Sequence, residues 1–199
     1  MFKRHQSRRD GTSDLDLVRA ASRGHESAVA ELYERHGALV YRFTLRMSGD
    51  AALAEEITQE VFLAFLRQPD QFDDQRSAFS TWLCGIARKQ LWKRLEREER
   101  FADLEECEEP ADPETLDGPH EWLSRKEAVA TIRNGIEQLP MLLKEVVVLC
   151  ELEELTYAQA SLILAVPVGT VRSRLHRAKA RLAALLCLEP ICAEEERHR

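Results

Sequence analysis

The sequence predicts an all-α protein of two small helical domains joined by an acidic flexible linker, with a helix-turn-helix in the C-terminal domain. Helix-forming Ala, Leu, Glu and Arg dominate two long stretches in which apolar residues recur every three or four positions. Between them, residues 98–121 carry ten net negative charges and include Pro110, Pro113, Gly118 and Pro119. Such a segment cannot bury a core. We therefore expect domains at 13–97 and 121–187 and a linker at 98–120.

In the first domain, the spacing predicts a helix that begins after Asp50 and ends before Pro69. Its apolar stripe leaves a polar face on another side. The stripe consists of Ala54, Ile57, Val61, Phe62 and Phe65, and the polar face of Glu55, Glu56, Gln59 and Glu60. A second helical run, residues 80–97, carries Trp82, Leu83, Ile86, Leu91 and Leu95, with basic residues between them.

The second domain starts with an apolar face that ends at Pro140. It is formed by Val129, Ile132, Ile136 and Leu139. The following run Val146–Leu149 has strand propensity and on its own permits a strand. Its helical neighbours and the lack of a second strand to pair with favour a helix.

Residues 156–182 contain the most informative pattern, TYAQASLILAVPVGTVRSRLHRAKARL. Thr156 can cap a short helix that ends near Ala165, because Pro167 disfavours helix in the residue before it. A second helix then starts around Val168. Its buried stripe is predicted at Val168, Val171, Leu175, Ala178, Leu182 and Leu185. Two helices joined by a short turn, the second rich in Arg, are typical of a helix-turn-helix.

The face opposite that stripe holds Arg172, Ser173, His176 and Arg177, with Arg174, Lys179 and Arg181 on the flanks. No acid occurs between Val168 and Leu188. Arginine on such a face can contact guanine with two hydrogen bonds, and flanking bases suit phosphates. The alternative is an amphipathic helix whose basic residues only keep it soluble.

Composition excludes several classes of protein. The 199 residues contain no apolar run near the roughly 20 residues that span a bilayer, and Met1–Arg9 lacks the apolar core of a secretory signal. We expect a cytoplasmic protein without membrane insertion. The five cysteines are widely spaced, and Cys187, Cys192 and His198 make a poor metal site, so we expect no metal and no cofactor. No catalytic motif is present, and we expect no enzyme.

Three segments in order resemble the extracytoplasmic-function (ECF) group of sigma factors, in the sigma-70 family. The segment LTYAQAS followed by GTVRSRLHRAKARL is similar to the family's part that binds the minus-thirty-five promoter element. AEEITQEVFLAFLR (Ala54–Arg67) resembles its polymerase-docking segment, and FSTWLCGIARKQLWKRL (Phe79–Leu95) its minus-ten segment. IEQLP and the apolar helix after it match the start of the family's C-terminal domain. The resemblance implies a subunit that binds core RNA polymerase and directs promoter-specific initiation.

The resemblance also implies roles for individual residues. Minus-thirty-five contacts fall on Thr170, Arg172, Ser173, Arg174, His176, Arg177 and Lys179. Minus-ten contacts fall on Phe72, Phe79, Trp82, Arg88, Lys89 and Lys93, although Phe79 and Trp82 also fit a core role. Polymerase contacts fall on Glu55, Glu56, Gln59, Glu60 and Phe62, where the alternative is a solvated face. The implied partners are the polymerase's largest-subunit clamp helices and its flap, promoter DNA and an anti-sigma protein.

The sequence departs from the family pattern at Lys89 and Lys93, where relatives often have Asn and Asp, so the minus-ten base cannot be transferred from them. Leu142 and Leu143 replace polar residues. The linker, in the family, passes toward the active-site cleft, and its acids could occupy basic channels there. The main competing reading is a free-standing helix-turn-helix regulator, which predicts a sensing domain in front that the sequence does not indicate.

Overall fold

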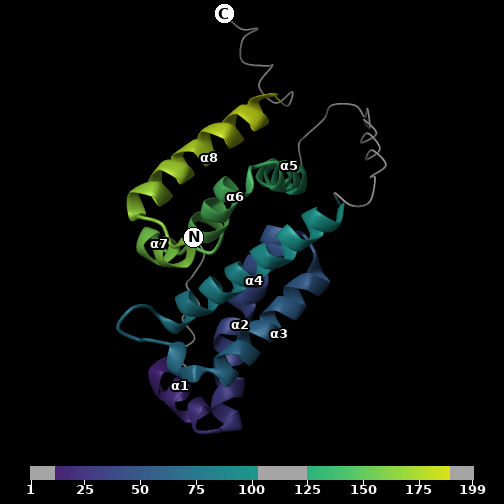
Figure 1. The fold of residues 1–199 in the computed structure, drawn as a ribbon. Helices are drawn as coiled ribbons and strands as arrows, with labels where there is room; N and C mark the ends of the chain where they lie inside the picture. The colour runs from purple at the N-terminus through teal and green to yellow at the C-terminus, as the bar shows by residue number, and fades with distance from the viewer. Residues whose placement is uncertain (1–11, 103–124, 189–199) are drawn as a thin grey trace, which may run out of the picture. The chain divides into compact units, whose positions relative to one another are not determined.

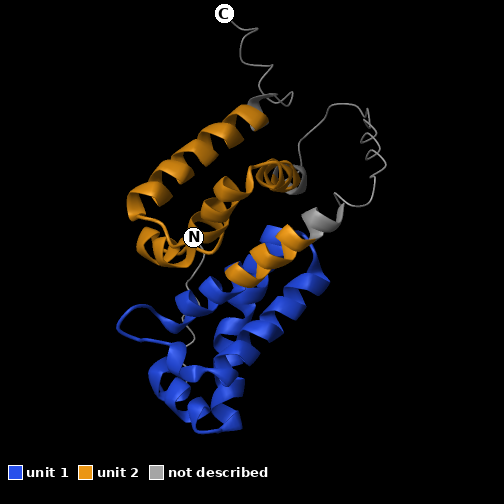
Figure 2. Cartoon of the chain, in the orientation of Figure 1, with its two compact units in different colours: residues 1–88 blue, residues 89–199 orange. Residues whose placement is uncertain are grey.

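The computed structural model describes residues 12–102 and 125–188, and within these ranges the regular structure is helical throughout (Figure 1). The chain divides into two compact units, residues 1–88 and 89–199 (Figure 2). The predicted all-α fold is confirmed. The predicted linker falls mostly on residues 103–124, outside the described residues, and its first residues, 98–102, continue helix α4.

The first unit consists of helices α1 (Asp14–Ser22), α2 (Glu26–Ser48) and α3 (Ala51–Arg67), the short 3₁₀ turn η1 (Pro69–Gln71) and the start of α4 (Phe79–Ala102). Helix α2 packs against both α1 and α3. Fully buried side chains from α2, α3 and α4 form the core, and they include Leu32, Val40, Phe43, Ile57, Phe65 and Leu83. The polar faces of these helices are left at the surface.

The position of α3 follows from local sequence. Gly49 ends α2 in the left-handed conformation (φ 75°), which glycine adopts without a steric penalty. Asp50 then caps α3, because its Oδ1 accepts hydrogen bonds from the backbone nitrogens of Ala52 at 2.8 Å and Leu53 at 3.2 Å. The predicted start of this helix at Asp50 is confirmed.

The second unit contains helices α5 (Arg125–Glu137), α6 (Met141–Val147), a single π-helical turn η2 (Val148–Leu152), α7 (Tyr157–Leu164) and α8 (Val168–Leu188). Helix α8 packs against α5, α6 and α7. The run Val146–Leu149 is helical and buried, so the helix favoured from the sequence is confirmed. Of the expected apolar face, Ile136 in α5 and Leu139 just after it are buried, whereas Val129 and Ile132 are about half exposed.

Candidate nucleic-acid interface

Helices α7 and α8 form the predicted helix-turn-helix. Thr156 and Gln159 make a reciprocal capping box at the start of α7, with the hydroxyl of Thr156 accepting from the backbone nitrogen of Gln159. Ala165 ends α7 in the left-handed conformation (φ 53°), which reverses the chain within the turn. The Ser161 hydroxyl donates to the carbonyl of Val166 at 2.6 Å, and α8 begins directly after Pro167. The predicted bounds of both helices are confirmed.

One face of α8 is buried and the opposite face is exposed, as the spacing predicts. Val171, Leu175 and Ala178 are buried in the unit, while Val168, Leu182 and Leu185 are half-buried at its ends. The exposed face carries Arg172, Ser173, His176 and Arg177. These four side chains lie one turn apart on the same side, where a groove of DNA could reach all of them at once.

The remaining predicted residues of α8 differ in exposure and in their neighbours. Thr170 and Arg174 are half-buried. Lys179 is exposed, but its Nζ lies 2.9 Å from Oε1 of Glu151, which is the main cause that raises the pKa of Lys179. A lysine paired in this way must exchange a carboxylate for a phosphate to contact DNA.

Tyr157, at the first position of α7, contacts the exposed face of α8. The guanidinium carbon of Arg172 lies over its ring, 5.8 Å from the ring centre. Sequence reasoning missed both Tyr157 and Glu151 as neighbours of the basic face. Local periodicity gives no signal for either, because each contact joins residues more than a dozen positions apart on different elements.

In the first unit, four aromatic side chains form one cluster beside the loop 68–78. The aromatic cluster consists of Phe65, Phe72, Phe79 and Trp82, with ring centres between 5.0 and 6.2 Å apart. Phe79 is only 2% exposed, whereas Phe72 and Trp82 are half-buried. Phe79 therefore supports the other rings, and the surface of the cluster belongs to Phe72 and Trp82. The expected contact of Phe79 with DNA stays a prediction.

The loop beside this cluster is ordered by its own turns. The Asp73 carboxylate accepts from the backbone nitrogen of Gln75 at 3.0 Å, and its carbonyl accepts from that of Arg76 at 3.1 Å. On α4, Lys89 and Lys93 are exposed and Arg88 is half-buried. Exposed aromatic surface, a turn of polar residues and basic side chains thus occur along one continuous segment, residues 72–93.

The polar face of α3 is exposed at Glu55, Glu56 and Gln59 and half-buried at Glu60. Phe62 is only 5% exposed, under the ring of Tyr33 at 4.9 Å between ring centres. The expected contact of Phe62 with a partner stays a prediction. This polar face belongs to a helix that is fixed by its buried stripe.

A capped helix, a short turn and a second helix with an exposed basic face define a DNA-binding protein of the helix-turn-helix class. Comparison with known proteins gives the family. Residues 32–101 match the sigma-70 region 2 model, and residues 130–182 match the model of sigma-70 region 4.

Curated relatives agree with these models. The chain is 31% identical over 175 residues to the ECF RNA polymerase sigma factor SigW of Bacillus subtilis, covering 83% of this chain and 92% of that protein. It is 32% identical over 154 residues to the ECF RNA polymerase sigma factor SigE of Mycolicibacterium smegmatis, covering 76% of this chain and 59% of that relative. The chain belongs to the ECF group of sigma-70 family RNA polymerase sigma factors, which direct transcription initiation at promoters.

A solved structure has the same fold. The sigma factor RpoE of Bartonella quintana, in complex with the anti-sigma factor NepR, matches with a TM-score of 0.63 and 19% identity, covering 80% of this chain and 97% of that one. Among the residues described here, no helix is long and apolar enough to cross a membrane, and no group of His, Cys, Asp or Glu side chains is arranged to hold a metal ion.

Proposed function

We propose that promoter recognition is divided between the expected domains 13–97 and 121–187. The second unit reads the minus-thirty-five element in the major groove with α8. The observation that carries this assignment is the exposed row Arg172, Ser173, His176 and Arg177, directly opposite a buried stripe. Arg172 and Arg177 supply donors for guanine, and Lys179 and Arg174 supply charge for phosphates.

The first unit binds core polymerase and opens the minus-ten element. The exposed carboxylates Glu55 and Glu56 and the amide of Gln59 suit a basic partner surface, the clamp helices of the largest subunit. Phe72 and Trp82 offer aromatic surface on which an unstacked base can be held. Farther along α4, past the boundary of the first unit at residue 88, Lys89 and Lys93 are exposed and suit contacts with the DNA backbone. Phe62 and Phe79 are buried, and they support the polar face of α3 and the half-buried rings of the aromatic cluster, respectively.

Co-purification with bacterial core RNA polymerase tests the polymerase contact. The native chain should be captured in stoichiometric amount, and a Glu56→Arg/Gln59→Ala variant should lose capture. Glu34→Arg is the matched control, because Glu34 is an exposed acid on α2 rather than on α3. Sequence-specific DNA binding without polymerase capture would instead favour the free-standing regulator.

Further proposals concern partners and surroundings. The likeness in fold to a sigma factor solved with its anti-sigma factor supports an anti-sigma partner for this chain, working with it in the cytoplasm. The exposed apolar side chains Leu142 and Leu162 of the second unit suit such a protein, because DNA recognition does not use them. The chain itself catalyses no reaction, and catalysis belongs to the polymerase. Loss of binding by Leu142→Asp, with polymerase capture retained, would test the anti-sigma surface once the partner is isolated.

A further inference from the structure

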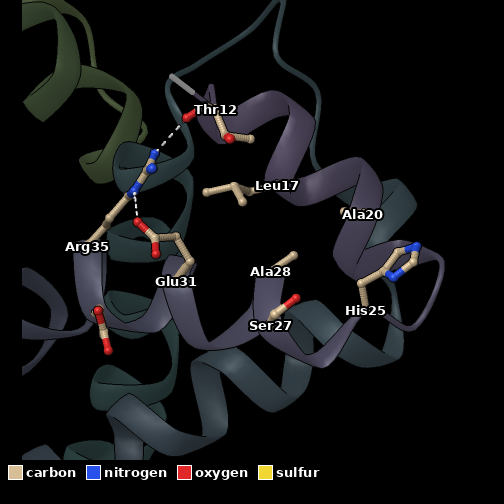
Figure 3. Close-up of a pocket in the computed structure, with 9 residues that line it drawn as sticks. Thr12, Leu17, Ala20, His25, Ser27, Ala28, Glu31 and Arg35 are labelled. Carbon is tan, nitrogen blue, oxygen red and sulfur yellow. Dashed lines mark hydrogen bonds and ion pairs between the residues drawn. The ribbon is translucent and has the colours of Figure 1, made fainter. Parts of the chain in front are cut away.

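A charged cluster ties the start of α1 to α2. The guanidinium of Arg35 donates from Nε to Oε1 of Glu31 at 2.9 Å, and from one terminal nitrogen to the carbonyl of Thr12 at 3.0 Å (Figure 3). The same nitrogen also donates to Oδ1 of Asp14 at 3.0 Å. These acceptors raise the pKa of Arg35, with Glu31 the largest cause. The guanidinium therefore fixes the Asp14 carboxylate in place, because its planar set of N–H donors is itself held by several acceptors.

The second oxygen of the same carboxylate faces a histidine. Oδ2 of Asp14 lies 2.7 Å from Nε2 of His36, whose side chain is only 14% exposed. The nitrogen is buried and has no well-aligned hydrogen bond among the described residues. The carboxylate of Asp14 is thus the charged group that faces this nitrogen.

The ring of His36 continues the chain of contacts into the aromatic cluster. It meets Phe79 edge-on, with ring centres 5.6 Å apart and planes at 73°. Phe79 in turn contacts Phe72 at 5.2 Å and stacks on Trp82 at 5.9 Å. A continuous line of contacts therefore runs from α1, through α2, to the two rings at the surface of the cluster.

We propose that Asp14 and His36 are positioning residues for capture of the minus-ten base. Packing against Phe79 alone needs only an apolar ring, and a Phe at position 36 would avoid a buried polar nitrogen. The histidine adds a fixed orientation, because Asp14 holds one edge of its ring while another part contacts Phe79. The pair thereby sets the position of Phe79, and Phe79 sets that of Phe72 and Trp82. This inference rests on the proposed role of the cluster in base capture.

The test uses holoenzyme assembled from core polymerase and the full chain, on a promoter selected from a randomised library. The minus-ten segment carries 2-aminopurine next to the captured base, so that fluorescence reports unstacking. Asp14→Ala removes the carboxylate, and His36→Phe keeps a ring against Phe79 but loses the contact with Asp14. Asp16→Ala is the matched control, an exposed acid on the same helix whose carboxylate pairs with Arg19 and accepts from the hydroxyl of Ser13, the N-cap of α1.

Asp14→Ala and His36→Phe should each slow opening by about three- to tenfold and reduce the preference for the captured base over the other three. Polymerase affinity and upstream-element affinity should match those of Asp16→Ala, at a temperature where melting curves show every variant to be folded. Opening as fast as in the control, or an equal loss for all four bases, would overturn the inference. Phe72→Ala distinguishes failure of the cluster's role in base capture from failure of the positioning role of Asp14 and His36. If Phe72→Ala leaves opening unchanged, the proposed role of the cluster is refuted. If Phe72→Ala slows opening but Asp14→Ala and His36→Phe do not, only the positioning role is refuted.

Discussion

The contact of Tyr157 with Arg172 gives a prediction about how the upstream element is read. The guanidinium carbon lies 5.8 Å from the centre of a ring that is 39% exposed. At such a site the cation–π attraction is worth about 0.5–1 kcal/mol, or about two- to fivefold in an equilibrium constant. A guanidinium that stacks by its face keeps the N–H groups on its edge free, which are the donors that guanine accepts. We therefore predict that the ring orients Arg172 for base contact.

Tyr157→Leu should weaken holoenzyme binding to the cognate upstream element by about two- to fivefold and reduce discrimination at the base that Arg172 reads. Tyr157→Phe keeps the ring and should retain that discrimination. Arg172→Ala should cost about 1–3 kcal/mol and relax specificity at the same base. Fluorescence anisotropy at one fixed salt concentration measures all three against a set of single-base promoter variants.

A double-mutant cycle decides whether the ring acts through the arginine. In an Arg172→Ala background, Tyr157→Leu should have no further effect on discrimination. If its effect persists there, or is equal for every promoter variant, Tyr157 contacts DNA on its own and the reasoning is refuted. Tighter binding by Tyr157→Leu would mean that the ring competes with DNA for the guanidinium.

Four further predictions concern single contacts. Glu151→Gln removes the carboxylate partner of Lys179 and should strengthen binding to all DNA sequences alike, whereas Lys179→Ala should weaken binding to all of them equally. A salt titration of DNA affinity measures both variants. A change in affinity at one base only would contradict the phosphate role of Lys179. Ala165→Gly relieves a left-handed backbone and should stabilise the second unit by about 0.5–1 kcal/mol in urea unfolding, whereas a loss would show that the alanine is unstrained. Asp50→Ala removes two capping hydrogen bonds and should lower the free energy of unfolding of the first unit by about 1 kcal/mol in the same urea experiment. Asp70→Ala is the control, because the Asp70 side chain does not cap a helix. Burial raises the pKa of Cys150, so that less of its thiol is ionised in the folded chain. In a chain with serine at the other four cysteines, Cys150 should therefore react with iodoacetamide at pH 8 more slowly when folded than when unfolded in guanidinium. Equal reaction rates would contradict this.

The helix-turn-helix could be predicted from sequence because each of its signals is local. Thr156 precedes the first helix, Pro167 separates the two, and the buried stripe of α8 repeats at helical spacing. The run Val146–Leu149 was ambiguous, since β-branched residues fit a strand as well, and its packing within a helical unit decides the outcome. The sequence alone was sufficient to predict these helices because the capping residue, the proline and the helical spacing of apolar residues all indicated the same bounds.

Burial and long-range pairing could not be predicted in the same way. Phe62 and Phe79 lie next to exposed residues in the sequence, and their burial depends on which helix faces which in the folded unit. Val129 and Ile132 show the opposite error, because a periodic apolar face can remain partly exposed. The pair Asp14 and His36 joins two helices, and neither residue belongs to a recognisable motif.

Charge explains why the reading face of α8 needs more than basic residues. The whole chain carries a net charge of −7, which opposes association with DNA phosphates at long range. Within the second unit, Glu151 forms an ion pair with Lys179, and the ring of Tyr157 contacts the guanidinium of Arg172, so two of the unit's cations already have partners. Non-specific attraction, which depends on free cations, is reduced more than base contact, which depends on oriented donors. We therefore predict that promoter choice by this chain depends on aligned side chains held at the DNA by polymerase, and that Glu151→Gln gains affinity for every DNA sequence without changing the affinity ratio between promoter variants.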